Sequence, residues 1–497
     1  MKRKFISGKI LCKILLICLA LEFFVFNYKH FESKFFENTS DYNVNYSSGI
    51  KEVSEGIYKI VNSEQAYFEI TELNVDVKNL YIDFVAIGEG RNLGERLPIT
   101  IEMTDAANAV YRALPATEVV NKIEESKYIR LHLSGKSSKI KINIQKEEQG
   151  VFSISEISVN KKRPLIIHPI RIFAIFIVGV LFVLFRSSSE LYSIVLDYKE
   201  KCQKKIIFFM IILHILLFVV IGFSALPFII WERDTWAASA EYEDLADAII
   251  DGHFYLNYNP PKYLEEMENP YDPSLRKIYQ EETGESFLWD FAYRNGRYYC
   301  YFGIVPALVF FVPFKLLTGM TLRTWIPVLL CVLLYCVGSF FFVYELIKKY
   351  YSRASLGIYL VLSSVYVASS EVLYLAHCGN VYSMPIALGL LLGVVGMGYW
   401  IRASRMSQMR KSHLILGATC IALIIGCRPQ LAVILLFAFP IFEKQIKSRD
   451  FFSKRGMKNT CSILAPFLVV GLGIMYYNFA RFGNPFDFGA NYNLTGN

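Results

Sequence analysis

Acidic side chains gather in one stretch of the chain, residues 231–300, which holds fifteen acidic side chains and only six basic ones. Most of these carboxylates are expected to be solvated. A helix over 235–251, capped by Asp234, places Glu241 at the margin of an apolar face that includes Leu245. A partly desolvated carboxylate has a raised pKa and is a useful base. Glu241 is therefore the leading candidate for general-base chemistry, and an edge side chain that only reaches to water is the alternative.

A second segment of this stretch, LWDFAYRNGRYYCYFG, combines Asp290 with a predicted hairpin and a run of aromatic side chains. The dipeptide Asn295-Gly296 between alternating residues predicts a tight hairpin turn. Tyr298 and Tyr299 either belong to an interfacial aromatic belt or stack on sugar rings. The preceding segment, NPPKYLEEMENPYDPSLR, holds four prolines and predicts an ordered loop without a helix.

The composition indicates what class of protein carries these residues. The chain has 497 residues, of which 54% are hydrophobic and 15% aromatic, so it is too apolar for a soluble protein and too long for one core. It predicts a polytopic α-helical membrane protein in a lipid bilayer. The net charge of +8 comes from Lys and Arg clusters between apolar runs, so nucleic acid is not an expected partner. The cysteines show no CxxC spacing and are expected to be packing residues; a disulfide between Cys300 and Cys378, which would face the oxidising side together, is the alternative for that pair.

Two regions are predicted in the N-terminal third of the chain. Residues 1–28 join a basic flank to an apolar run and lack a small-residue cleavage site, which predicts an uncleaved membrane anchor. Residues 29–163 alternate with a period of two, as in the segment 140–144, where isoleucines alternate with Lys141 and Asn143. This pattern predicts an extracytoplasmic β-rich domain that resembles a β-sandwich. A scaffold is the expected role of this domain, and carbohydrate binding is the alternative.

Apolar runs of spanning length recur after Pro164. A spanning helix and a cytoplasmic loop are expected over 164–204, and a membrane domain over 205–497. With the N-terminal anchor, the apolar runs predict about nine spans. The runs lie at 166–186, 207–230, 325–346, 355–376, 383–402 and 460–478, with a shorter pair, 413–427 and 431–443, that meets at CRPQ.

The predicted sidedness depends on four loops that are rich in Lys and Arg. Their ranges are 199–205, 348–353, 402–411 and 444–458. The positive-inside rule places these loops in the cytoplasm, with the N-terminus. All four remain there only if the apolar segment 303–318 lies along the outer membrane surface, which its two prolines and Lys315 favour. The loop 231–324 is then extracytoplasmic, like the β-rich domain.

The order of these features resembles the GT-C superfamily of integral-membrane glycosyltransferases. Such enzymes carry acidic residues in the first large outer loop, followed by a loop with a basic residue, paired tyrosines and two prolines, an interfacial helix and a spanning helix. The matching segments are LADAIIDGHFYL, WDFAYRNGRYYCYFGIVPALVFFVPFKLLTG and LRTWIPVLL. NPYDPSLR and YNFARFGNPFDFGANYNLTG look like segments of an allied bacterial branch of membrane proteins. The resemblance covers about 205–497 and implies a GT-C-like fold for that part.

The resemblance implies a polyprenyl-phosphate sugar donor and transfer at the outer membrane face to a cell-envelope glycan or lipid acceptor, with inversion of the anomeric carbon. It implies that Glu241 or Asp234 takes the acceptor proton, and that Asp290 is a further acidic candidate. The leaving phosphate gains negative charge and needs a cation at the outer interface. Arg428 is the favoured cation. The other available basic residues are Arg323, Lys315 and Arg481.

The sequence also bears on cofactors and on other classes of function. No cofactor is expected; a divalent metal stays open, but no acidic or histidine cluster in the sequence supports one. The alternative function is a non-catalytic polysaccharide-assembly component or a transporter. A transporter would show internal repeats and ionisable residues at mid-membrane. Since the acidic residues gather outside the predicted spans, the pattern favours chemistry at the membrane surface.

Overall fold

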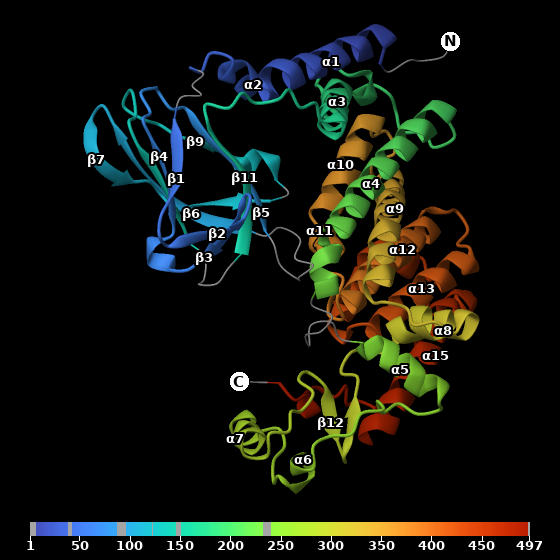
Figure 1. The fold of residues 1–497 in the computed structure, drawn as a ribbon. Helices are drawn as coiled ribbons and strands as arrows, with labels where there is room; N and C mark the ends of the chain where they lie inside the picture. Colours follow the sequence, from blue (N-terminus) through green and yellow to red (C-terminus); the bar gives the residue numbers. More distant parts are fainter. Residues whose placement is uncertain are drawn as a thin grey trace. The chain divides into compact units, whose positions relative to one another are not determined.

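The computed structural model describes residues 6–37, 42–86, 96–121, 123–145, 151–231 and 240–495. These residues divide into two compact units, an N-terminal unit of Ile6–Val183 and a C-terminal unit that begins at Leu184. Figure 1 draws the first unit in blue to blue-green and the second in green to red. The two large β-sheets belong to the first unit, and the helices of spanning length belong to the second.

The N-terminal unit contains two open sheets. One has the order β1-β4-β10-β6-β7, with β8 also paired to β6, and the other has the order β2-β3-β11-β5-β9. All of these described pairings are antiparallel. The strands are β1 (Asn43–Tyr46), β2 (Ile50–Ser54), β3 (Ile57–Ile60), β4 (Tyr67–Thr71), β5 (Asn79–Ala86), β6 (Arg96–Asp105), β7 (Asn108–Ala113), β8 (Thr117–Val120), β9 (Tyr128–Arg130), β10 (Ile140–Ile144) and β11 (Val151–Val159).

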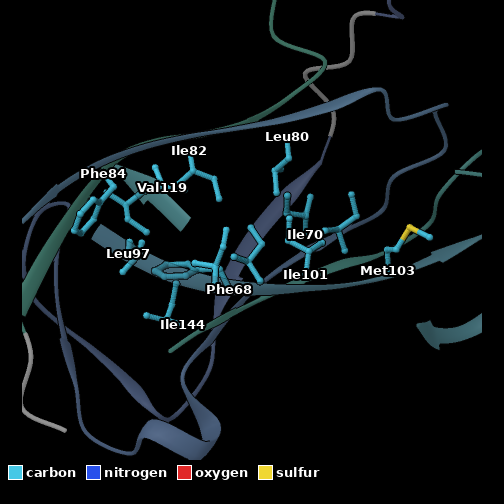
Figure 2. Close-up of a cluster of buried hydrophobic side chains, with 14 of the residues drawn as sticks. Phe68, Ile70, Leu80, Ile82, Phe84, Leu97, Ile101, Met103, Val119 and Ile144 are labelled. Carbon is cyan, nitrogen blue, oxygen red and sulfur yellow. The ribbon is translucent and has the colours of Figure 1, made fainter. Parts of the chain in front are cut away.

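Side chains from both sheets form one hydrophobic core, part of which Figure 2 shows. In β10, buried isoleucines alternate with the half-exposed Lys141 and Asn143, as the sequence predicts. Strand β5 of the other sheet contributes Leu80, Ile82 and Phe84 to the same core. Each such side chain stabilises the fold by about 1.5–3 kcal/mol when it leaves water. The predicted β-rich region is therefore confirmed.

Apolar helices precede and follow these strands in the N-terminal unit. Helix α1 (Gly8–Ala20) passes into a π-helical turn (Leu21–Phe26) and then into α2 (Tyr28–Ser33), while α3 (Pro169–Phe185) follows the last strand. A side chain at Gly179 of α3 would lie 2.7 Å from Ile14, so glycine lets α3 pack closely on α1. Helix α1 is too short to count among the helices of spanning length, and the anchor over 1–28 stays a prediction.

In the C-terminal unit, five described helical segments are long and apolar enough to cross a membrane. They are α4 (Lys201–Trp231), α9 (Trp325–Tyr350), α12 (Ser383–Arg405), the segment Pro429–Lys447 and α15 (Met457–Phe482). The nine expected spans are not confirmed, because α3, α10 (Leu356–Ala368) and α13 (Lys411–Ile425) are shorter apolar helices. The apolar surface of these helices is suited to a lipid bilayer.

One of the expected spans is interrupted in the structure, and one expected break is present. The run 355–376 divides into α10 and α11 (Val372–His377). Between them, the Ser369 and Ser370 hydroxyls donate to backbone carbonyls three residues back, at 3.1 and 2.7 Å, which competes with helix continuation. The predicted break at CRPQ is confirmed, since α13 ends before it and a 3₁₀ segment (Pro429–Phe437) leads into α14 (Ala438–Lys447).

The apolar segment after the hairpin forms a short helix. A π-helical turn (Ala307–Phe311) continues as α8 (Val312–Thr318), which ends at Gly319 with φ of 68°. A helix of this length extends about 18 Å, well short of the roughly 30 Å hydrocarbon core. In Figure 1, α8 runs crosswise to α9 and α12. Its length fits a surface segment, and its side of the membrane stays a prediction.

The chain between α4 and α9 also forms short polar elements. They are α5 (Glu241–Ile250), α6 (Tyr263–Glu266), α7 (Pro273–Thr283), β12 (Ala292–Arg294) and β13 (Arg297–Tyr299). The predicted hairpin is confirmed, with Asn295 and Gly296 at φ of 49° and 69°. The expectation that the proline-rich segment lacks a helix is wrong at two places, because α6 lies within it and α7 begins near its end. Helix α7 begins at Pro273, where the helix needs no N–H donor, and the Asp272 side chain caps it.

Candidate active site

Helix α5 places a carboxyl group in the interior of the C-terminal unit. The described helix begins at Glu241, and Asp234 lies outside the described residues. The next residue, Tyr242, is fully buried and stacks on Phe311 with 5.5 Å between ring centroids. This ring pair holds the first turn of α5 against the π-helical turn that precedes α8. Glu241 is only 2% exposed as a result.

The described residues around Glu241 offer little to stabilise a negative charge. Its Oε2 accepts a weak hydrogen bond from the Cys300 thiol, with 3.8 Å between sulfur and oxygen. Burial raises the pKa of Glu241 well above its ordinary value of 4.5, and the negative charge of Asp290 raises it further. Burial also raises the pKa of the Cys300 thiol, which therefore keeps its proton. A carboxylate in such a position takes up a proton readily.

Asp290 is held by groups that are distant in the sequence. It has a left-handed backbone conformation, with φ of 64°, directly before β12. The Tyr382 hydroxyl donates to Oδ2, and the Asn493 amide donates to Oδ1 at 2.6 Å. The Asp290 backbone N–H donates to the Leu494 carbonyl at 3.1 Å. These bonds fix the carboxylate in one orientation and make both of its oxygens acceptors.

A cavity of about 140 Å³ lies beside residues that contact these carboxylates. Arg481 is 5% exposed, and its two terminal nitrogens donate to the Cys300 carbonyl and the Asn478 side chain, both at 2.9 Å. Among the described residues, neither the Arg481 Nε nor the Tyr477 hydroxyl has a partner. Buried donors without partners are rare, so this cavity is suited to an anion. The lining residues include Phe302, Gly426, Arg428, Tyr477, Asn478 and Arg481.

Arg428 brings a second guanidinium group to the same cavity. It lies 5.9 Å from the centre of the Phe302 ring, whose edge meets the Tyr382 ring at 5.3 Å. The backbones of the two segments approach closely, because a side chain on Gly303 would collide with the Gly426 carbonyl. Two glycines therefore allow the Phe302 segment and the Arg428 segment to form one wall.

The remaining candidates from the sequence lie elsewhere. Lys315 forms an ion pair with Asp247 across α8 and α5, and Arg323 is exposed just before α9. Tyr298 and Tyr299 are buried: the Tyr298 hydroxyl accepts from a backbone N–H at 3.2 Å, and the Tyr299 ring packs on a phenylalanine. Their rings stabilise the hairpin and have no open face for a sugar. The structure thus places Arg428 and Arg481 on one cavity. Glu241 and Asp290 do not line it, but Cys300 connects Arg481 to Glu241.

Some residues of the site were not selected from the sequence. Tyr382 and Asn493 stand 92 and 203 residues from Asp290, and no local pattern marks them. Cys300 was expected to be a packing residue, and only its place beside the hairpin brings its thiol to Glu241. Among the residues that the structure describes, no group of three or more His, Cys, Asp or Glu side chains could hold a metal ion.

Comparisons with models of known protein families, with curated proteins and with solved structures give no match to this chain. The site is therefore interpreted from its own geometry. The apolar helices indicate a membrane protein. Next to them, two guanidinium groups line one cavity, and a desolvated carboxyl group and a second carboxylate contact neighbours of the lining residues. This arrangement is suited to proton transfer beside an anionic ligand.

Proposed function

We propose that the chain is a membrane glycosyltransferase that uses a polyprenyl-phosphate sugar and acts on a cell-envelope glycan or lipid acceptor at the outer membrane face. The observation that supports this is a cavity lined by Arg428 and Arg481. Arg481 donates to the carbonyl of Cys300, whose thiol contacts Glu241, and the charge of Asp290 acts on Glu241. The proposal includes a GT-C-like, multi-pass fold of about nine spans, in which the shorter apolar helices also cross the bilayer. It also includes the sidedness expected from the basic loops.

The cavity is proposed to hold the phosphate of the donor. Arg428 and Arg481 supply two positive charges, and the Arg481 Nε and the Tyr477 hydroxyl supply donors that lack protein partners. A guanidinium group matches the geometry of phosphate oxygens and keeps its charge inside a protein. Such donors stabilise the negative charge that develops on the leaving phosphate. The apolar helices beside the cavity suit the polyprenyl chain.

Glu241 is proposed to act as the base. The acceptor oxygen attacks the anomeric carbon while the bond from that carbon to the phosphate oxygen breaks. The bonding electron pair leaves on the phosphate, the acceptor proton passes to Glu241, and the anomeric configuration inverts. Because the charge of Asp290 raises the pKa of Glu241, it makes Glu241 a stronger base. Tyr382 and Asn493 keep Asp290 in place for this role.

Transfer can be measured with the full chain in proteoliposomes, with radiolabelled glucose or arabinose on polyprenyl monophosphate and a bacterial membrane extract as acceptor. Glu241→Gln is expected to lower turnover by about 10²–10⁴-fold. Arg428→Gln is expected to weaken binding of farnesyl phosphate, a soluble probe for the lipid phosphate. Glu266→Gln is the matched control, because Glu266 is exposed in the same loop region.

Two results would contradict the proposal. One is turnover in Glu241→Gln and in Asp290→Asn that equals that of the unchanged protein. The other is binding of farnesyl phosphate that is insensitive to both Arg428→Gln and Arg481→Gln. Either result would favour a non-catalytic assembly component or a transporter, which were the alternatives from the sequence.

A further inference from the structure

The N-terminal unit presents two apolar helical segments with many side chains uncovered. In α3, Ile170 is 85% exposed, and Phe182 is also largely exposed. In α1 and the π-helical turn after it, Leu16 and Phe24 are exposed in the same way. An apolar surface of this kind is suited to contact with lipid chains. The segments next to these helices, residues 28–37 and 160–171, would then lie at the depth of the lipid headgroups.

Two side chains hold these departing segments together. The Asn27 amide bonds both backbone groups of Ile166, accepting from its N–H and donating to its carbonyl, each at 3.0 Å. Glu22 is buried and accepts from two nitrogens of Arg171, at 2.7 and 2.6 Å. The two segments therefore leave the apolar helices side by side. Together, residues 28–37 and 160–171 carry six Lys or Arg side chains and two acidic ones.

A cleft of about 510 Å³ opens among these segments and the strand region around β9. We call it the basic cleft. Among the described residues, Glu32 is its single lining carboxylate, and Glu32 pairs with Arg130 at 3.1 Å. Phe35, almost fully exposed, also lines it. The lining includes the polar residues Lys29, Lys78, Asn79, Arg130, His132 and Arg163.

Asn79 gives the basic cleft an acceptor as well as donors. It is 3% exposed, and its Nδ2 donates to the Lys161 carbonyl at 3.2 Å, which fixes the orientation of the amide. The Asn79 Oδ1 has no partner among the described residues. Since buried polar atoms are nearly always paired, this oxygen points to a ligand that brings a hydroxyl donor.

We propose that the basic cleft binds the headgroup of an anionic phospholipid that carries hydroxyl groups, as phosphatidylglycerol does. Lys29 and Arg163 attract the phosphate, while Lys78 and Arg130 are paired with Asp76 and Glu32. The Asn79 Oδ1 accepts from a headgroup hydroxyl, and Phe35 contacts the acyl region. The uncovered apolar helices next to it keep the acyl chains in the bilayer. Because all these residues belong to the N-terminal unit, this site is independent of the proposed transfer reaction.

The test uses the full chain in detergent and measures its affinity for dihexanoyl phosphatidylglycerol by calorimetric titration. We expect tighter binding than for dihexanoyl phosphatidylcholine, which is zwitterionic, and than for dihexanoyl phosphatidic acid, which lacks the headgroup hydroxyls. Lys29→Gln is expected to weaken binding about fivefold, the usual effect of one basic residue at a membrane surface. Lys51→Gln, on the exposed strand β2, is the matched control and is expected to change nothing. Asn79→Ala is expected to remove the preference for phosphatidylglycerol over phosphatidic acid.

Several results would overturn this proposal. Equal affinity for phosphatidylglycerol and phosphatidylcholine would exclude recognition of an anionic headgroup. An equal loss from Lys51→Gln and Lys29→Gln would assign the effect to overall charge. Binding of free glycerol phosphate as tight as that of the lipid would exclude a lipid site. If Asn79→Ala does not fold, Lys29→Gln still decides the matter, because Lys29 is exposed at the surface.

Discussion

Two buried glutamates of the C-terminal unit differ in what surrounds them. Glu345 in α9 is 0% exposed, and Arg402 and Arg405 of α12 donate to its two oxygens at 2.7 and 2.8 Å. Glu241 is buried almost as deeply, yet among the described residues only a thiol, at 3.8 Å, donates to its carboxylate. The first carboxylate is neutralised and joins two helices. The Glu241 carboxylate has no cation beside it among the described residues, so it binds a proton more readily, as reactive carboxyl groups do.

The arginines of the two regions show the same difference. Arg402 and Arg405 direct their donors at a carboxylate. Arg481 directs two of its donors at neutral oxygens and keeps its Nε without a partner among the described residues. Its guanidinium group stacks on the Tyr477 and Phe482 rings and forms no ion pair among the described residues. Burial alone does not distinguish a structural ion pair from a candidate site. The two differ in whether each buried polar atom has a hydrogen-bond partner within the protein.

The largest expected effect is a difference in turnover between glutamine variants of the two glutamates, measured in the same assay. Glu241→Gln is expected to lower turnover about 10³-fold, because it removes the base. Glu345→Gln keeps one oxygen acceptor and is expected to leave turnover within about twofold, since it is far from the reacting groups. Turnover is measured per mole of protein that elutes as a single species in detergent. Similar losses of turnover in both variants would show that the different surroundings of the two glutamates do not matter for function.

The next effect concerns stability. Glu345→Ala leaves two guanidinium groups beside each other without their carboxylate, which is expected to cost about 3–5 kcal/mol. Glu241→Gln replaces a buried carboxyl group by a neutral group of nearly the same shape, so its cost is expected to be below about 1 kcal/mol. Thermal unfolding in detergent, followed by the exposure of buried cysteines, measures both. A smaller loss for Glu345→Ala than for Glu241→Gln would reverse the interpretation of the two sites.

A smaller and pH-dependent effect follows from the raised pKa of Glu241. Between the unfolded value of about 4.5 and the higher folded value, the folded chain binds more protons than the unfolded one. The stability contribution of Glu241 therefore falls as pH rises through this window, by at most about 1.4 kcal/mol per pH unit. Unfolding midpoints of the unchanged protein and of Glu241→Gln, compared from pH 4 to pH 8, measure the difference. Asp290→Asn should shift the window to lower pH, and a difference that grows toward acid would contradict the assignment.

The smallest effect concerns the support of Asp290. Asn493→Ala removes one hydrogen bond to the carboxylate and is expected to lower turnover about tenfold, because such a bond is worth roughly 1.5–3 kcal/mol. The KM for the donor should stay unchanged, since the phosphate cavity is intact. Asn484→Ala, in the exposed turn after α15, is the control. A raised KM with unchanged turnover would show that Asn493 does not act through Asp290.

Local features of the fold could be predicted from the sequence. The Asn295-Gly296 turn needs positive φ at both positions, and this requirement is visible in the residue types. The alternation in β10 and the break before Pro429 follow from side-chain period and from proline geometry in the same way. The number of spanning helices could not be predicted, because the break at Ser369 depends on side-chain hydrogen bonds that composition does not reveal.

The candidate site was predictable only in part. Helical geometry brought Glu241 to the edge of an apolar face, and the structure buries it there. The contacts of Asp290 with Tyr382 and Asn493 join three distant parts of the chain, so no local pattern specifies them. Lys315 had the right charge for a phosphate ligand, but its pairing with Asp247 depends on how α8 lies on α5. Tertiary packing decides such partners.

The contact between the Leu494 region and the β12 hairpin has a consequence for synthesis of the protein. Leu494 is buried and exchanges backbone hydrogen bonds with Asp290 and Phe291, at 3.1 and 2.9 Å. When translation has reached the end of α15, the backbone hydrogen bonds between Leu494 and the Asp290 segment cannot yet form. Under the proposed function, the candidate site is therefore complete only after the segment around Leu494 has been synthesised, later than all the described helices of spanning length.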